Sequence, residues 1–191
     1  MGIRSAIFVC VLALLSACGG KGGEVIATGD RYVSNRAVVT DYRLGIGDKV
    51  RVTVFREPDV SGEFAVAPDG TVALPLIGAV PAVGRRIDEL AAEAQARYGD
   101  GYLRNPQVGV EVTTFRPFFM LGEVGAQGQY PYSVGLTAFN AIATAQGFTP
   151  RADRYIVHIR REGATVEENY RLTPDLRIYP GDTVRVGERF F

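Results

Sequence analysis

The chain has 191 residues, of which 47% are apolar and 22% are charged, a composition typical of globular domains. Lysine plus arginine and aspartate plus glutamate both number 21, so the formal net charge is zero, and no basic excess suggests nucleic acid as a partner. No stretch reaches the roughly 20 apolar residues that a membrane-spanning helix requires.

The first residues have the pattern of a secretory signal. Arg4 precedes the apolar run Ala6–Ala17, which is too short to span a membrane. Small residues and a cysteine then follow, and Leu15, Ser16, Ala17 and Cys18 resemble a bacterial lipobox. In that resemblance residues 1–17 are removed and Cys18 is lipidated. The alternative is an ordinary cleaved signal peptide without lipid.

Residues 18–41 are expected to form the lipidated N-terminus and a tether to the first domain. They begin glycine-rich and show no apolar period. Their later part, Val33–Thr40, could join an edge strand. Gly19, directly after the cysteine, resembles the residue found in lipoproteins that are sorted to the outer membrane. The mature chain would have no free thiol, because Cys10 leaves with the signal and Cys18 carries the lipid.

Residues 42–116 predict a small α+β domain. Alternating apolar residues, with turn residues between them, predict strands. These strands cover Lys49–Phe55, Gly62–Ala67, Thr71–Leu76 and Gln107–Phe115. The second and third are expected to pair as a hairpin. Apolar residues at helical spacing predict a helix over Arg86–Tyr98. Arg86 stands three residues before Glu89, so we expect no capping box, at a cost of roughly 1 kcal/mol.

Residues 117–191 predict a second α+β domain. The predicted strands cover Phe118–Val124, Gln129–Val134, Tyr155–Arg161, Thr165–Leu172 and Asp182–Val186. A helix is predicted over Thr137–Gln146, capped by Thr137 and ended by Gly147. The order of hairpin, helix and further strands matches a β-grasp sheet with one helix across it.

One phrase occurs at both ends of the predicted fold. Gly47-Asp48 precedes a strand of alternating valines, and Gly181-Asp182 precedes another. Chance is the alternative explanation, because Gly-Asp turns before valine-rich strands are common.

Several motifs, in order, resemble a known family. YRLGIGDKVRVTVF, SGEFAVAPDGTVALPLIGAV and YLRNPQVGVEV resemble the polysaccharide-export domain of the outer-membrane polysaccharide export (Wza-type) family. FFMLGEVGAQGQYPY, LTAFNAIATAQGFTPRA and PGDTVRV resemble the soluble-ligand-binding β-grasp domain that follows it in that family. The motif positions with an expected structural role are Gly47, Asp48, Asp69, Gly70, Pro75, Leu76, Gly78, Pro106, Val108, Gly122, Val124, Gly128, Gly181 and Asp182.

The resemblance implies a periplasmic ring of subunits held by lipid at the outer membrane. Capsular polysaccharide or exopolysaccharide would pass through the ring, and an inner-membrane polysaccharide co-polymerase would meet it. This chain has room for one β-grasp domain and lacks the C-terminal pore helix of long members. We therefore expect it to be a short form that works with a separate outer-membrane partner, a β-barrel.

The sequence predicts no catalytic, metal or cofactor site. His158 is the single histidine, and it has no neighbouring ligand pattern or visible Ser-His-Asp arrangement. Asp48, Glu57 and Asp69 belong to predicted turns, where aspartate binds its own backbone. A glycosidase-like pair of carboxylates is the alternative for these acids.

Four arginines cluster in the second domain: Arg151, Arg154, Arg160 and Arg161. They could contact acidic sugars or carboxylates of a neighbouring subunit, because a planar guanidinium pairs with two carboxylate oxygens at once. A solvated strand edge is the alternative.

Three functions follow from these readings. The leading hypothesis is a lipid-anchored, ring-forming conduit for polysaccharide. The second is a glycan-binding adaptor lipoprotein that forms no pore, and the third is a polysaccharide-processing enzyme.

Overall fold

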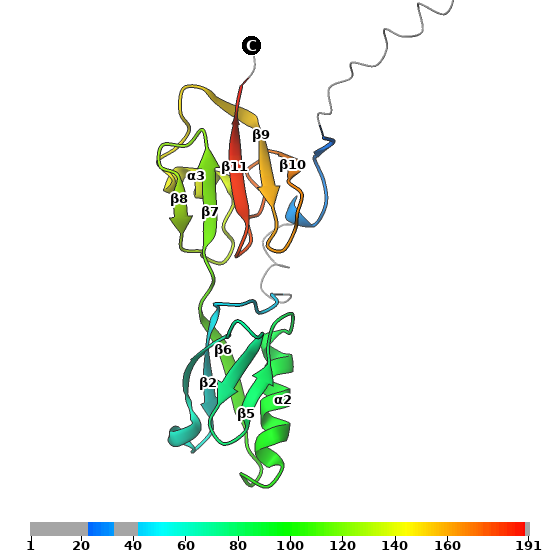
Figure 1. Cartoon of the computed structure of the whole chain (residues 1–191), viewed down its shortest axis with the longest axis vertical. Helices are drawn as coiled ribbons and strands as arrows, with labels where there is room; N and C mark the ends of the chain where they lie inside the picture. The colour runs from blue at the N-terminus through cyan, green and yellow to red at the C-terminus, as the bar shows by residue number, and fades with distance from the viewer. Residues whose placement is uncertain (1–22, 33–41, 190–191) are drawn as a thin grey trace, which may run out of the picture.

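The computed structural model describes residues 23–32 and 42–189, which form two stacked units, and the extended segment at Arg116-Pro117 leads from the first unit into the second (Figure 1). The signal peptide, the lipobox with Cys18 and the possible edge strand at Val33–Thr40 lie outside the described residues. Each unit has its own hydrophobic core, and both units combine strands with one α-helix, as the α+β prediction requires.

The first unit is built around β2 (Lys49–Val54). Val50, Val52 and Val54 are buried while the residues between them are exposed, which is the alternation of a half-buried strand. β2 lies between β3 (Gly62–Ala65) and β6 (Val108–Thr114), antiparallel to both. Helix α2 (Ile87–Gly99) packs on this core through Leu90, Ala94 and Tyr98.

The predicted hairpin of the second and third strands is wrong. β4 (Thr71–Leu74) does not pair with β3 but with β5 (Gly78–Pro81), in a separate two-stranded sheet. Two backbone hydrogen bonds close the turn between β3 and β4: the Ala67 N–H donates to the Thr71 carbonyl, and the Gly70 N–H donates to the Ala67 carbonyl. The chain reverses instead at Leu76, whose φ of 67° is in the left-handed region that ordinary residues seldom adopt. No alternating pattern predicts such a reversal.

The helix start differs in part from the prediction. Arg86 is the N-cap, and its backbone N–H donates to the Glu89 carboxylate at 2.9 Å. That half of a capping box is therefore present. The other half is not available, because a guanidinium has no acceptor atom for the backbone N–H three residues on. The Arg86 side chain instead pairs with Asp88.

The second unit contains a six-stranded sheet, and five of its strands come from the chain after Arg116. These five strands are β7 (Phe118–Gly122), β8 (Gly128–Tyr130), β9 (Ala152–Arg160), β10 (Glu168–Arg171) and β11 (Thr183–Glu188). They lie in the order β10-β9-β11-β7-β8, with β11 and β7 parallel. Helix α3 (Ala138–Thr144) packs on one face through Ala138, Ala141 and Ile142. Its N-cap is Thr137, whose hydroxyl accepts the Asn140 N–H.

The sixth strand comes from the predicted tether. β1 (Val25–Ile26) pairs in parallel with β10 at the edge of the second sheet, and Figure 1 shows it beside β10. A short 3-10 turn, Asp30–Tyr32, follows. The Arg31 side chain is fully buried. The prediction of a tether is therefore wrong for residues 23–32, which are part of the second unit.

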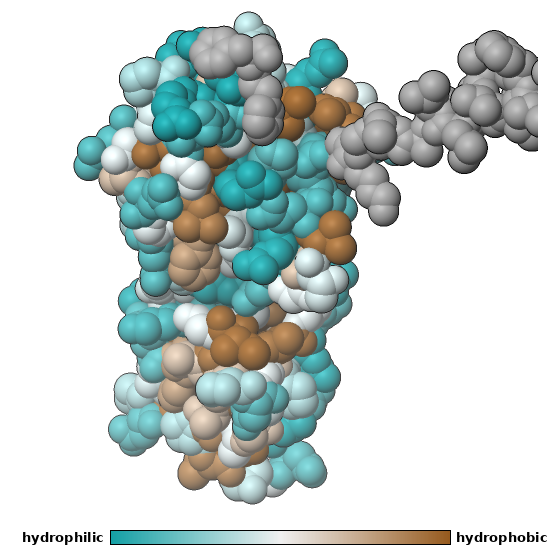
Figure 2. Space-filling view, turned by 45° about the horizontal axis from the view of Figure 1, so that its top comes forward, coloured by the Kyte–Doolittle hydropathy of each residue, from teal (hydrophilic) through white to brown (hydrophobic). Residues whose placement is uncertain are grey.

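In the residues that the structure describes, no helix is long and apolar enough to cross a membrane. On the face shown in Figure 2, apolar residues form small patches among polar ones.

Candidate functional site

The joint between the two units is organised by a buried carboxylate. Asp48 follows the Gly47 turn and has no solvent exposure. Its Oδ2 atom accepts the Gly45 N–H at 2.8 Å and the Tyr42 hydroxyl at 2.5 Å. Its Oδ1 atom accepts the Arg116 N–H at 2.8 Å. A carboxylate with this many donors is held in one position, so Asp48 fixes the start of β2 against the joint.

Arg116 connects the two units. Its Nη1 atom lies 3.0 Å from Asp48 Oδ2 in the first unit. Its Nε atom lies 2.6 Å from Glu162 Oε2, on the turn between β9 and β10 of the second unit. The side chain of Arg116 is 16% exposed, so solvent screens these ion pairs less than it screens surface pairs. One guanidinium thus bridges carboxylates from both units.

Aromatic rings support the same joint. Phe115 contacts Tyr42 edge-on, with ring centroids 5.0 Å apart. Phe115 also contacts Tyr132 of the second unit, with ring centroids 5.4 Å apart. Edge-to-face pairs of this kind add stability beyond the apolar area that they bury. Burial, followed by its hydrogen bond to Asp48, raises the pKa of Tyr42 well above the usual tyrosine value, so Tyr42 stays a neutral donor.

Two glycines leave room for Arg116. A Cβ on Gly45 would overlap the Arg116 guanidinium. A Cβ on Gly181 would lie 2.8 Å from Glu162 Oε2 and 3.0 Å from Arg116 Nε. Gly181 also has φ = 82°, a conformation that glycine adopts without strain. A side chain at either position would therefore displace the Arg116 or Glu162 side chain from its place in the bridge.

An open groove of about 510 Å³ lies at this joint. One side is formed by Ile46, Arg116 and Pro117. The floor and the other side come from the second unit, and include Phe119, Arg160, Arg161, Glu162 and Thr183. The groove lining therefore includes three arginines and one glutamate, and its volume is within the size range of small-molecule sites.

The second Gly-Asp phrase builds a matching site in the second unit. Asp182 is 1% exposed, and its Oδ2 atom accepts the Tyr179 N–H, three residues earlier, at 2.8 Å. Asp48 accepts the Gly45 N–H across the same spacing. Each aspartate also pairs with a distant arginine, Asp182 with Arg31 at 2.8 Å. The two phrases thus share one local geometry.

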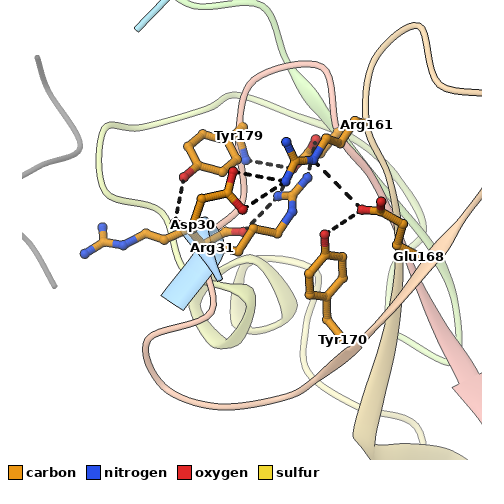
Figure 3. A network of polar contacts seen from close by, with 8 residues as sticks. Asp30, Arg31, Arg161, Glu168, Tyr170 and Tyr179 are labelled. Atoms are coloured by element: carbon orange, nitrogen blue, oxygen red, sulfur yellow. Dashed lines mark hydrogen bonds and ion pairs between the residues drawn. The ribbon is translucent and has the colours of Figure 1, made fainter. Parts of the chain in front are cut away.

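Arg31 lies within a network of polar and aromatic side chains (Figure 3). Its guanidinium lies over the rings of Tyr170 and Tyr179, 5.2 and 5.1 Å from their centroids. Burial disfavours its charge, but Asp182 more than offsets this penalty, and the pKa of Arg31 is raised. Arg161 joins the network by pairing with Asp30 at 3.1 Å.

The structure divides the four arginines that were predicted to contact sugar or subunits. Arg160 and Arg161 line the groove. Arg151 pairs with Glu188, and Arg154 lies 5.8 Å from the Phe148 ring centroid. These two residues do not line the groove. The structure therefore brings Arg160 and Arg161 together with Arg116, which sequence reasoning identified only as part of a joint.

The remaining motif positions lie at turns and strand ends. Asp69 accepts the N–H and hydroxyl of Thr71, at 2.9 and 2.8 Å, so it binds its own turn as predicted for an Asp-Gly pair. Val124 is buried and bridges Phe148. Positive φ angles occur at Gly70, Leu76, Gly78, Gly122 and Gly128. Pro75 follows β4, and Pro106 and Val108 lie at the start of β6.

Of the candidates for catalysis, His158, Glu57 and Asp69 do not line the groove, whereas Asp48 binds Arg116 of the groove wall. The His158 Nδ1 atom contacts Asn169 Oδ1 at 2.6 Å on neighbouring strands. Glu57 is exposed beside a 3-10 turn. Among residues 23–32 and 42–189, no cluster of three or more His, Cys, Asp or Glu side chains could hold a metal ion.

Sequence reasoning missed Arg31 and the role of Arg116. Both arginines act on aspartates far away in the chain, 151 and 68 residues distant. The available signal was the repeated Gly-Asp phrase, because a buried aspartate before a central strand needs a cationic partner.

Comparison with known proteins points to one family. Residues 36–113 match the model of the family described as "Polysaccharide biosynthesis/export protein". The chain is 33% identical over 154 residues to the exopolysaccharide production protein ExoF of Rhizobium meliloti (strain 1021), covering 74% of this chain and 34% of that protein. It is 26% identical over 159 residues to the polysialic acid transport protein KpsD of Escherichia coli, covering 78% and 28%. The chain thus spans about a third of the length of these relatives.

Proposed function

Because this chain belongs, through residues 36–113, to the polysaccharide biosynthesis/export protein family, we propose that it is a structural component of a conduit that exports capsular polysaccharide or exopolysaccharide. The observation that carries the proposal is the family match, together with relatives named for exopolysaccharide production and polysialic acid transport. The family description includes export, and one relative is named as a transport protein, so the role that we propose is passage of a polymer without chemistry on it.

The proposal extends to the placement of the protein. Lipid on Cys18 holds the chain at the outer membrane, facing the periplasm. The lipobox Leu15–Cys18 supports this placement, and two or more acyl chains anchor a protein stably. Subunits form a ring, which meets an inner-membrane co-polymerase and a separate outer-membrane partner. The second unit is a β-grasp domain, and the strand order β8-β7-β11-β9-β10 with a parallel central pair supports this assignment.

The structure supports a passive mechanism. Asp48, Arg116 and Glu162 bridge the two units, so each subunit is a stiff rod in place of two independently moving units. Stiff subunits can enclose a cavity of fixed width. The joint groove is open, and open surfaces release a passing chain readily, whereas a site that binds too tightly stops conduction.

Complementation tests the export role. A strain that lacks the gene should secrete no polysaccharide, and the full chain should restore secretion. A Cys18→Ala variant should lose the lipid, seen as a lower mass of the intact protein, and should leave the membrane fraction. Normal secretion in the strain without the gene would refute the export role.

Electron microscopy of the detergent-purified full chain, with and without its co-polymerase, tests the ring separately. Closed rings in either preparation support it, and monomers under both conditions rule it out.

A further inference from the structure

Three residues form a row on the floor of the joint groove. Arg160 is paired in register with Thr183, and Thr183 with Phe119, across strands β9, β11 and β7. Residues paired in register point to the same face of a sheet. Their neighbours Ile159, Val184 and Met120 belong to the core beneath α3, so the row points away from that core, because successive side chains alternate between faces. All three residues line the groove.

The arginines of the groove differ in whether they form ion pairs with carboxylates of the protein. Arg116 is held by Asp48 and Glu162, and Arg161 by Asp30 and Glu168. Arg160 is exposed and takes part in none of the ion pairs formed among the described residues. Arg160 interacts electrostatically with Glu167, but the Glu167 carboxylate already accepts a hydrogen bond from Arg185, with Nε and Oε2 3.0 Å apart. The Arg160 guanidinium is thus available to an external anion.

The row also offers an apolar ring and a hydroxyl. Phe119 is 39% exposed, although it lies in a strand whose neighbouring residues, Phe118 and Met120, are buried. An exposed aromatic ring beside a hydroxyl and a guanidinium gives one apolar surface and two hydrogen-bonding groups. This combination fits a ligand with an apolar face, hydroxyl groups and a negative charge.

We propose that the joint groove is a weak binding site for carboxylate-bearing sugar units, with Arg160 binding the carboxylate, Thr183 a hydroxyl and Phe119 the apolar face of the sugar ring. The proposal rests on the proposed function, because it takes the passing polysaccharide as the ligand. Arg116 and Arg161 are each paired with carboxylates of the protein, so Arg160 supplies the positive charge that an acidic sugar can bind. The groove thus favours acidic over neutral polysaccharides, while its openness keeps binding reversible.

A titration of the isotope-labelled full chain in detergent micelles, followed by backbone amide NMR shifts, tests the site. The probes are trigalacturonate, which is acidic, and maltotriose, which is neutral. We expect trigalacturonate to shift the amides of Phe119, Arg160 and Thr183 and to bind about tenfold more tightly than maltotriose, the worth of one charge-assisted hydrogen bond. Raising the salt concentration should weaken the binding of trigalacturonate but not the binding of maltotriose.

Single variants locate the site. Arg160→Gln should weaken trigalacturonate about tenfold and leave maltotriose unchanged. Phe119→Ala should weaken both sugars by about threefold to tenfold. Arg154→Gln is the matched control, because Arg154 is exposed on the same strand outside the groove, and it should leave both affinities unchanged. Unaltered melting temperatures confirm folding.

Three outcomes overturn the proposal: equal affinity for the two sugars, an Arg160→Gln variant with wild-type affinity for trigalacturonate, or a variant that changes only the self-association of the protein. The last outcome would identify the groove as a contact between copies. If the full chain restores secretion but binds the two sugars equally, the sugar site in the groove is refuted and the export role is not. If the protein prefers trigalacturonate but does not restore secretion, the export role is refuted and the sugar site is not.

Discussion

The Arg31 Nη1 atom lies 2.8 Å from Asp182 Oδ2, and the two side chains, 151 residues apart, are shielded from solvent. This ion pair attaches the N-terminal segment to the second unit. Around it, the Arg31 carbonyl accepts the Arg177 N–H, and the Tyr32 hydroxyl lies within hydrogen-bond distance of the Ile26 and Arg171 carbonyls. Residues 23–32 are therefore part of the fold that they precede in the chain.

Replacement of Arg31 should destabilise the protein strongly. Arg31→Met keeps much of the apolar volume but leaves Asp182 buried without its cation, which costs about 3–5 kcal/mol when a buried pair is broken on one side. Urea unfolding of the full chain measures the change. Arg51→Met is the control, because the Arg51–Glu111 pair is exposed and such pairs contribute less than about 1 kcal/mol. Equal effects of the two variants would contradict the role of Arg31.

Loss of the Arg116 bridge should loosen the joint. Arg116→Gln removes the ion pairs to Asp48 and Glu162 but leaves both cores intact, since Arg116 belongs to neither. Spin labels at the exposed residues Glu57 and Tyr155, one in each unit, report the distance between units. We expect a broader distribution of distances in Arg116→Gln. Glu162→Gln should broaden it less, because Glu162 is 47% exposed and its pairing is partly screened. An unchanged distribution in Arg116→Gln would refute the bridge.

Two glycines with similar backbone angles allow the cost of backbone strain to be measured separately from the cost of steric overlap at the joint. Gly163 and Gly181 have φ of 76° and 82°, so alanine at either costs about 1–2 kcal/mol for the left-handed backbone. A Cβ on Gly163 meets open space, whereas one on Gly181 meets Glu162 and Arg116. We expect Gly181→Ala to lose about 1–3 kcal/mol more than Gly163→Ala, because overpacking adds that much. Equal unfolding free energies of the two variants would show that the Arg116 and Glu162 side chains move aside without cost.

The sequence predicted elements whose pattern is local. The alternation Val50, Val52 and Val54 identified β2 to within one residue, and Thr137 marked the start of α3. It failed where pairing depends on distant residues. β1 is two residues long and pairs with β10, too short for any period. β5 follows a left-handed turn at Leu76, and a leucine side chain does not predict such a turn.

The candidate site was predictable in its parts but not in its assembly. The sequence placed Asp48, Arg160 and Arg161 among residues of interest and put the joint at Arg116. It could not show that Arg116 turns back to Asp48, or that Arg160 shares a row with Phe119, because register across three strands depends on the whole sheet. It also could not separate Arg160 and Arg161 from Arg151 and Arg154, which differ only in their surroundings.

The protein should lose stability as the pH rises above about 10, and Tyr42 should account for part of the loss. Burial and then the hydrogen bond to Asp48 raise the pKa of Tyr42 in the folded state, while an unfolded tyrosine ionises near pH 10. The neutral tyrosine therefore contributes stability fully below about pH 10. Above that value, proton release from the unfolded state reduces this contribution by up to about 1.4 kcal/mol per pH unit.

A Tyr42→Phe variant isolates this contribution. At pH 8 it should be less stable than the wild type by about 1–2 kcal/mol, because the phenol donates to Asp48 and accepts from Arg116. As the pH rises from 10 to 11, the wild type loses a contribution that the variant never had, so the difference between them should shrink. Burial also raises the pKa of Tyr98 and Tyr132, so both proteins should still lose stability with pH. Urea unfolding at pH 8, 10 and 11 measures the difference, and a constant difference would mean that Tyr42 ionises equally in both states.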